Sequence, residues 1–336
     1  MKSCSRLLLF VILFGFQISE AQNLTPLNFY QNTGEINHGR MDITDSLLFW
    51  PLGEEGMLIF DVSNPLNIEK VKHFKEYELR SYRKVYGSVN SVQLDGNTAY
   101  IAHGDLGFKI IDFSDPVKPV TKGVYYRHIP VNEFLLYKDY AFLGLWGNGV
   151  EAVDYSDLKD ISLVSRKNMG GIYVNKLDLH NRYLYAACGK DGIRIIPYKK
   201  PITDFKSDGF IRTYFPEGEV KDLIIDEDYA FVANGKKSLL VLNLDLPEHP
   251  TTHVNIETEG RCNGLFLQEN NLFVATTRGI EIFSVEDKEN IFKISDFSDN
   301  KRSYQTLLVE DNYLYGTYQR NSLFSKHYGF GIFQIQ

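Results

Sequence analysis

The segment MLIFDVSNP, at residues 57–65, decides the fold because it recurs along the chain. Residues 108–116 read FKIIDFSDP, and residues 150–158 read VEAVDYSDL. Weaker copies follow as IRIIPYKKP from residue 193, LLVLNLDLP from 239, IEIFSVEDK from 280 and FGIFQIQ from 330. Each copy is a short apolar run that ends at a turn, which predicts one β-strand in every repeat.

Asp61 in the first copy provides a reference position for the repeat. Its equivalents, at spacings of 51, 42, 43, 46, 41 and 50 residues, are Asp112, Asp154, Pro197, Asn243, Ser284 and Gln334. A second pattern, a turn followed by a short aromatic strand such as GNTAYIA at residues 96–102, also occurs seven times. Two patterns with the same count predict an all-β propeller with seven four-stranded blades. The aspartates are expected to cap the turn after the strand.

The first residues have the pattern of a secretory signal peptide. Lys2 and Arg6 precede an apolar run at residues 7–16, and Ser19 and Ala21 occupy the small positions before a cleavage site. This apolar run is too short to span a bilayer, so we expect no membrane span. The sequence therefore predicts a signal peptide at residues 1–21 and a single propeller domain at residues 22–336. We expect a monomer that is exported to the periplasm, the cell surface or the medium.

The two ends of the chain indicate how the ring closes. The last repeat stops at its third strand, and a strand-like segment, PLNFYQ at residues 26–31, precedes the first repeat. We expect residues 26–31 to form the missing outer strand of the last blade, which removes an open sheet edge. After the signal peptide only Cys188 and Cys262 remain. They fall in non-neighbouring blades, so two buried thiols are expected rather than a disulfide.

These repeats resemble the LVIVD repeats of a family of exported bacterial β-propeller proteins. The resemblance is good in the first three repeats and degenerate in the last four, where the aspartate is lost. It implies a propeller fold and a location outside the cytoplasm. It implies no catalytic residues.

Composition and motifs exclude several functions. The formal net charge is −7, which argues against a nucleic-acid partner. The chain contains no phosphate-binding loop, dinucleotide fingerprint, zinc-protease motif, calcium loop or nucleophile elbow. We therefore expect neither a cofactor nor a metal.

One position in each blade predicts a polar ring at the mouth of the central channel. It lies ten residues before each aromatic residue of the second pattern, where the innermost strand begins. These positions are Gly39, Asn90, Asn132, Asn175, Lys221, Asn263 and Gln305. Two interpretations stay open, because asparagine at such a point can contact a ligand or can hold the backbone of a neighbouring loop.

Loops on the same face are expected to supply longer side chains. Further ligand contacts are predicted from His38, Arg40, Tyr86, His103, Trp146, Arg278 and His327. Both tryptophans, Trp50 and Trp146, are expected on this face, where an exposed ring would stack on a sugar. The many basic residues and the few acidic ones indicate an anionic or polyhydroxylated ligand.

Two insertions account for the longest repeats. Residues 76–87, EYELRSYRKVYG, lengthen the connection after the first blade, and residues 318–329, YQRNSLFSKHYG, lengthen a loop of the last blade. Both are expected on the channel face at the seam of the ring. Long loops on a rigid scaffold often carry function.

Two functions are consistent with these patterns. The first is a non-catalytic module that binds a partner protein or a glycan through the loop face. The second is a carbohydrate-active enzyme, a polysaccharide lyase or hydrolase, with His103, His128 or His327 as a base. Formation of unsaturated products from anionic polysaccharides would distinguish the two.

Overall fold

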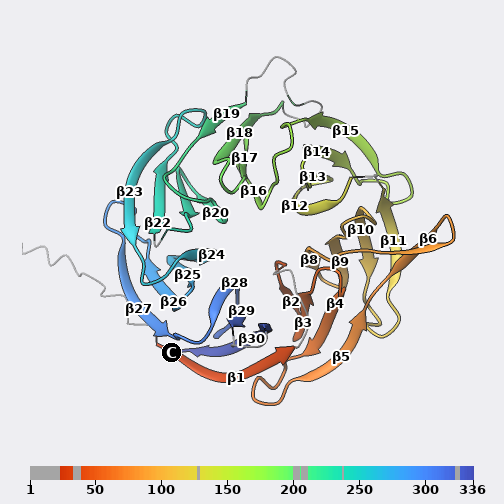
Figure 1. Cartoon of the computed structure of the whole chain (residues 1–336), viewed down its shortest axis with the longest axis horizontal. Coiled ribbons are helices and arrows are strands. Elements are labelled where there is room, and N and C mark those ends of the chain that lie inside the picture. Colours follow the sequence, from red (N-terminus) through yellow and green to blue (C-terminus); the bar gives the residue numbers. More distant parts are fainter. Residues whose placement is uncertain are drawn as a thin grey trace, which may run out of the picture.

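A computed structural model of the chain describes residues 23–32, 39–126, 129–199, 205, 211–236, 238–321 and 326–336. Within these ranges the chain consists of β-strands and turns without a helix. Seven antiparallel sheets of four strands each surround a central axis (Figure 1). The all-β fold and the seven blades predicted from the repeats are thereby confirmed. The expected signal peptide lies outside the described residues.

The first three blades follow one another along the chain, with the first strand of each nearest the axis (Figure 1). Blade 1 contains β2 (Asp42–Thr44), β3 (Leu47–Pro51), β4 (Met57–Asp61) and β5 (Glu69–Phe74). Blade 2 contains β8 (Ser91–Asp95), β9 (Thr98–Ala102), β10 (Phe108–Asp112) and β11 (Val120–Tyr125). Blade 3 contains β12 (Val131–Tyr137), β13 (Tyr140–Leu145), β14 (Gly149–Asp154) and β15 (Ser162–Lys167).

Blades 4 to 6 repeat this order. Blade 4 contains β16 (Lys176–His180), β17 (Tyr183–Ala187), β18 (Ile193–Pro197) and β19 (Arg212–Tyr214). Blade 5 contains β20 (Asp222–Asp226), β21 (Tyr229–Ala233), β22 (Ser238–Asn243) and β23 (Thr251–Glu257). Blade 6 contains β24 (Cys262–Gln268), β25 (Asn271–Thr276), β26 (Gly279–Ser284) and β27 (Phe292–Ser298). No helix in the described part of the chain is long and apolar enough to cross a membrane.

Blade 7 joins the two ends of the described chain. Its strands are β28 (Ser303–Glu310), β29 (Tyr313–Asn321), β30 (Lys326–Ile335) and, outermost, β1 (Leu24–Asn32). Strand β1 runs antiparallel to β30, with Leu24 opposite Ile335 and Asn32 opposite Tyr328. The predicted closure by residues 26–31 is confirmed, because β1 gives blade 7 the fourth, outermost strand that every other blade has.

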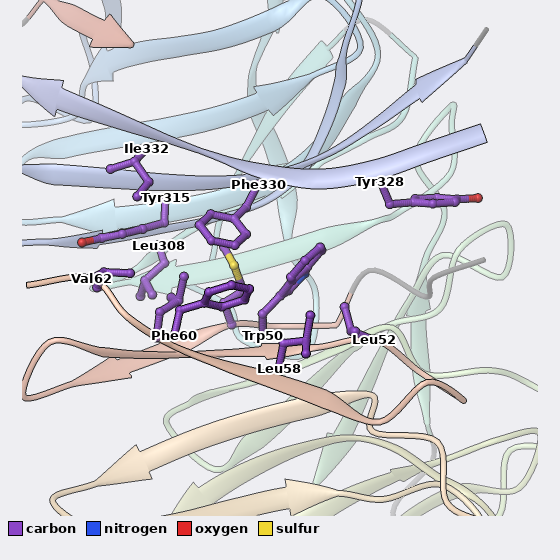
Figure 2. Packing of buried hydrophobic residues seen from close by; sticks show 12 residues of the cluster. Trp50, Leu52, Leu58, Phe60, Val62, Leu308, Tyr315, Tyr328, Phe330 and Ile332 are labelled. Atoms are coloured by element: carbon purple, nitrogen blue, oxygen red, sulfur yellow. The ribbon is translucent and has the colours of Figure 1, made fainter. Parts of the chain in front are cut away.

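Aromatic side chains fill the seam between blades 7 and 1. The ring centroid of Trp50 on β3 lies 5.3 Å from that of Phe330 on β30 (Figure 2). It lies 6.0 Å from the ring centroid of Tyr30 on β1. Trp50 is fully buried there. The expectation that Trp50 lies on the loop face is wrong. Trp50 lies inside β3, and its side chain packs against the neighbouring blade.

The second insertion also belongs to the seam. Residues 318–329 extend β29 and β30 as a paired ribbon on both sides of residues 322–325, which lie outside the described ranges. Tyr318 and Tyr328 are buried, and the Tyr318 hydroxyl donates to the Tyr30 carbonyl at 3.1 Å. The described aromatic residues of this insertion therefore pack into the closure of the ring.

The repeated aspartates cap turns, as expected. Oδ1 of Asp61 accepts a hydrogen bond of 2.9 Å from the Ser63 amide, and Asp154 makes the same contact with Ser156. Asn243 replaces the aspartate in blade 5 and accepts from the Asp245 amide at 2.9 Å. An amide oxygen serves as well as a carboxylate here, which explains how blade 5 keeps this turn without the aspartate.

Candidate functional site

A cavity of about 790 Å³ lies on the axis of the propeller. Its walls are the innermost strands and the residues that lead into them, and every blade contributes to the lining. Six of the seven predicted ring positions line it, namely Asn90, Asn132, Asn175, Lys221, Asn263 and Gln305. The ten-residue offset in the sequence thus located the channel wall.

Gly39, the seventh position, is buried beside the channel and does not line it. A Cβ atom at Gly39 would lie 2.4 Å from the carbonyl oxygen of Asn90 and 2.6 Å from Cβ of Pro51. Glycine is therefore required by the close approach of the backbone of blade 2. The adjacent Arg40 reaches the cavity in its place.

Four asparagines of the ring connect each blade to the next. The Nδ2 amide of Asn132 donates to the carbonyl of Val174 at 2.8 Å, and that of Asn175 donates to the carbonyl of Val220 at 3.1 Å. In each case the acceptor immediately precedes the next ring position. The remaining bonds follow the same rule: Asn90 to Val131 at 3.1 Å and Asn263 to Tyr304 at 2.7 Å. These contacts support the interpretation that the asparagines hold neighbouring loops.

The ring of amide contacts is interrupted at blade 5. Lys221 takes the place of asparagine and pairs with Glu219 at 2.8 Å. The carbonyl that an asparagine would reach belongs to Cys262, and it keeps only the main-chain bond from the Gly235 amide at 3.1 Å that the equivalent carbonyls of Val131 and Val220 also accept from loop glycines. Lys221 and Glu219 are each about two-fifths exposed, so they are available to a ligand in the channel.

Sequence reasoning missed the acidic side chains of the channel. Among the described residues that line it, six are carboxylates and three are cations. The carboxylates are Asp42, Glu133, Asp178, Glu219, Asp222 and Glu310, and the cations are Arg40, Lys176 and Lys221. The expectation that acidic residues are sparse on this face is therefore wrong for the channel wall. Four of these charged residues directly follow ring positions, which is the signal that could have revealed them: Arg40, Glu133, Lys176 and Asp222.

Three of the aspartates also join neighbouring blades. Oδ2 of Asp42 accepts from the Leu94 amide at 2.7 Å, and Oδ2 of Asp178 accepts from the Ile225 amide at 2.8 Å. Asp222 accepts from the Leu265 amide at 2.9 Å. Burial raises the pKa of Asp42 and Asp178, while these amide contacts act in the opposite direction.

Glu133 is the most deeply buried carboxylate of the channel, at 5 % exposure. Its Oε1 atom accepts no hydrogen bond and lies 3.9 Å from Nζ of Lys176. Burial raises the pKa of Glu133, and the nearby Lys176 and Arg40 oppose that rise. The inner channel thus holds opposite charges from three blades close together.

His103 is not on an accessible surface. The side chain is fully buried in the loop between β9 and β10, and neither ring nitrogen has a hydrogen-bond partner. Burial and the nearby Lys109 lower the pKa of His103 to about 3. At neutral pH the ring is uncharged, so its 3.7 Å contact with the Glu76 carboxylate is not an ion pair.

The remaining predicted contacts are dispersed over the molecule. Tyr86 belongs to the first insertion, and Arg278 is exposed in the loop between β25 and β26. His327 contacts Gln31 at 3.0 Å near the outer edge of blade 7. None of these three, nor His103, lines the cavity. His38 lies outside the described residues.

Trp146, unlike Trp50, is exposed. It is 55 % exposed in the loop between β13 and β14 and forms an edge contact of 5.9 Å with Tyr173, which is 53 % exposed. Tyr173 stands two residues before Asn175, a residue of the channel wall. The pair forms an exposed aromatic surface between the β13–β14 loop of blade 3 and the segment that leads into blade 4.

The described residues contain neither a disulfide nor a cluster that could hold a metal ion. Cys188 and Cys262 are unpaired and buried, which confirms the expected separate thiols. Burial raises the pKa of Cys188 to about 12 and that of Cys262 well above its ordinary value. No group of three or more His, Cys, Asp or Glu side chains in the described part is arranged to hold a metal ion.

The fold defines this protein as a seven-bladed β-propeller. Residues 86–126 and 217–258 match the family model described as the LVIVD repeat. Each match covers one whole blade, β8 to β11 and β20 to β23, and the second includes a blade without the aspartate. The chain is thus a seven-bladed propeller in which two blades match the LVIVD repeat.

Solved structures show the same architecture at low sequence identity. A chain of the mitotic checkpoint complex matches with a TM-score of 0.65 and 12% identity, covering 95% of this chain and 98% of that one. A protein from Lactobacillus plantarum matches with a TM-score of 0.63 and 14% identity over 80% and 86%. The computationally designed Ika8 protein matches with a TM-score of 0.60 and 8% identity over 92% and 99%. No curated protein matches the sequence. These likenesses concern the fold alone.

Proposed function

We propose that the protein is an exported, non-catalytic binding module that takes a glycan or a partner protein at the mouth of its channel. The observation that carries this proposal is the axial cavity of about 790 Å³, to which all seven blades contribute polar side chains. Its amides, carboxylates and amines offer both donors and acceptors. Sugar hydroxyls need both kinds of partner, so the lining favours a polyhydroxylated ligand.

The exposed pair of Trp146 and Tyr173 also favours a glycan. The faces of sugar rings carry C–H groups that pack against aromatic rings. A ligand that contacts this pair can continue toward Asn175 and the channel wall, because Tyr173 lies in the segment that leads into β16. The site would then combine one stacking surface with one polar cavity.

The charges of the channel favour a neutral glycan over an anionic one. Carboxylates outnumber cations two to one among the described lining residues. Several of them are partly or fully buried, where repulsion of an anion is weakly screened. Acidic polysaccharides, the substrates expected for a lyase, would meet this repulsion on entering the cavity.

The positions of the described histidines favour binding over catalysis. The enzymatic alternative needs a base at the channel, but His103 is enclosed in the protein and His327 contacts Gln31 near the outer edge of blade 7. His128 lies outside the described residues. No specific contact in the described channel favours a reaction.

Fluorescence provides a direct test, because the chain has only two tryptophans and one is buried. Titration with neutral oligosaccharides is expected to change the emission of Trp146, and Trp146→Ala is expected to abolish binding. A matched control is Leu66→Ala, which alters an exposed side chain on the turn between β4 and β5. Binding that persists in Trp146→Ala, or that is confined to acidic polysaccharides, contradicts the proposed glycan site. Release of unsaturated products would establish the enzymatic alternative.

Export has its own test. If residues 1–21 are a signal peptide, the protein recovered outside the cytoplasm begins at Gln22. Sequencing the N-terminus of that protein checks the position of cleavage. Recovery of the uncleaved chain in the cytoplasm would contradict this part of the proposal.

A further inference from the structure

The first insertion forms a β-hairpin that stands out from the ring. Strands β6 (Tyr77–Arg80) and β7 (Arg83–Tyr86) pair only with each other. The hairpin extends beyond the outer circle of the propeller, next to β11 (Figure 1). Its position differs from the expected place around the channel mouth, because it begins directly after β5, the outermost strand of blade 1.

The base of the hairpin is fixed to blade 2. Oε2 of Glu76 lies 2.7 Å from Nζ of Lys109, a side chain of β10 that is almost completely buried. The Gly87 amide donates to the Glu76 carbonyl at 3.3 Å, which closes the base. The hairpin is therefore held at one end and presents its other end to the surroundings.

Side-chain contacts on one face of the hairpin hold its two strands together. Tyr77 stands opposite Tyr86, with ring centroids 5.6 Å apart, and Lys84 Nζ lies 4.2 Å from the Tyr77 ring centroid. Such cross-strand pairs stabilise a ribbon that has no sheet beside it. They do not involve Tyr82, which occupies the turn.

The tip carries large side chains that the fold does not use. Tyr82 is fully exposed and Leu79 is 70% exposed. The turn residues Ser81 and Tyr82 have φ angles of +46° and +67°, a region in which two-residue hairpin turns favour asparagine and glycine. A bulky aromatic residue in this conformation is unfavourable for folding. The stability of the hairpin therefore does not explain why tyrosine occupies the tip.

The charge at the tip is positive on a protein whose net charge is −7. Arg80 stands directly opposite Arg83 across the hairpin, and Lys84 follows. An anion placed against the exposed start of β7 would gain charge-assisted contacts with Arg83 and Lys84.

We propose that the tip of this hairpin docks on an anionic lipid surface, with Leu79 and Tyr82 entering the interface and Arg83 and Lys84 contacting the phosphate groups. Tyrosine is enriched where membranes meet water, and cationic residues near an anionic leaflet add attraction. A soluble polyanion would satisfy the charges but offers no apolar phase to Leu79. The contact is peripheral and needs no membrane-spanning segment.

Vesicle sedimentation tests this proposal on the chain that begins at residue 22. The protein is expected to pellet with vesicles of equal parts phosphatidylglycerol and phosphatidylcholine, less so at high salt, and to remain in solution with phosphatidylcholine alone. Leu79→Ser combined with Tyr82→Ser is expected to weaken binding about tenfold, because exposed apolar groups are lost without any change in charge. Arg83→Glu combined with Lys84→Glu is expected to abolish it.

A matched control separates the tip from general exposed apolar surface. Leu66→Ser changes a leucine that is 67% exposed on the turn between β4 and β5, and binding is expected to remain unchanged. All these sites are exposed, so an unchanged near-ultraviolet circular dichroism spectrum verifies the fold. Equal binding to both vesicle types, or full binding by the Leu79 and Tyr82 variant, overturns the proposal. Binding to soluble heparin that needs Arg83 but not Tyr82 assigns the tip to a polyanion instead and also overturns it.

Discussion

The side-chain amide of Asn132 donates a hydrogen bond of 2.8 Å to the main-chain carbonyl of Val174, the residue before Asn175 in the next blade. The same bond recurs at three other boundaries between blades. The asparagines of the channel wall therefore also connect neighbouring blades. A ligand in the channel would contact groups whose positions are fixed by these bonds.

Asn132→Ala is expected to destabilise the protein by about 1 kcal/mol, because one hydrogen bond between blades is lost and the Val174 carbonyl loses its donor. For a domain of this size the melting temperature should fall by roughly 1 to 2 °C. Gln305→Ala is the matched control, because the Gln305 amide contacts Ser303 within its own blade. Equal losses in both variants, measured by thermal unfolding, would contradict a role for Asn132 in connecting the blades.

Deleting residues 22–31 is expected to lower the melting temperature sharply and to promote aggregation. The deletion removes most of β1, exposes the edge of β30 and uncovers the aromatic seam beside Trp50 and Phe330. The chain that begins at residue 22 serves as the reference. Thermal unfolding and light scattering check the result, and an unchanged melting temperature would mean that β1 is not needed to close the ring.

His103 is expected to make stability depend on pH. The unfolded chain binds a proton at this residue near its ordinary pKa of 6.5, whereas the folded protein does so only near 3. Between these values the unfolded state holds more protons, so stability falls as the pH falls. The slope contributed by this residue reaches about 1.4 kcal/mol per pH unit.

The variant His103→Gln isolates this contribution, because glutamine does not titrate. Denaturant unfolding of both proteins between neutral and mildly acidic pH should give a shallower decline for the variant. Identical slopes would show that His103 is accessible to protons in the folded state.

The two thiols are expected to be unreactive in the folded chain that begins at residue 22. Burial raises the pKa of both Cys188 and Cys262, and only the thiolate is a good nucleophile. A thiol reagent should label neither cysteine at neutral pH and both after denaturation. Rapid labelling of either one without denaturant would indicate local opening of blade 4 or blade 6.

The sequence was sufficient for the architecture because propeller blades repeat a local pattern. The strand that ends at Asp61 and the aromatic strand after each turn recur at similar spacings, so the number of blades and the outer strand of the last one followed directly. The residues of the polar ring could be predicted from the same repeat, because an equal sequence offset in every blade reaches the same level of the central channel.

The chemistry of the site depends on contacts that a repeat does not encode. Trp50 and Trp146 both occur near the end of a second strand, but one packs into the seam and the other faces solvent. His103 looked accessible because it follows β9, yet Gly87 allows the neighbouring segment to cover its ring. Burial of this kind arises between segments from different blades, which a pattern within one blade cannot reveal.

The pairing of β1 with β30 also constrains the order of events during synthesis. The amide of Asn23 donates to the carbonyl of Gln336 at 3.0 Å, and the amide of Gln336 donates back to Asn23 at the same distance. Blades 1 to 6 can each form from contiguous chain, but the seventh needs residues from both ends. The ring therefore becomes complete only after β30 has been synthesised. Until then β1 has no partner strand.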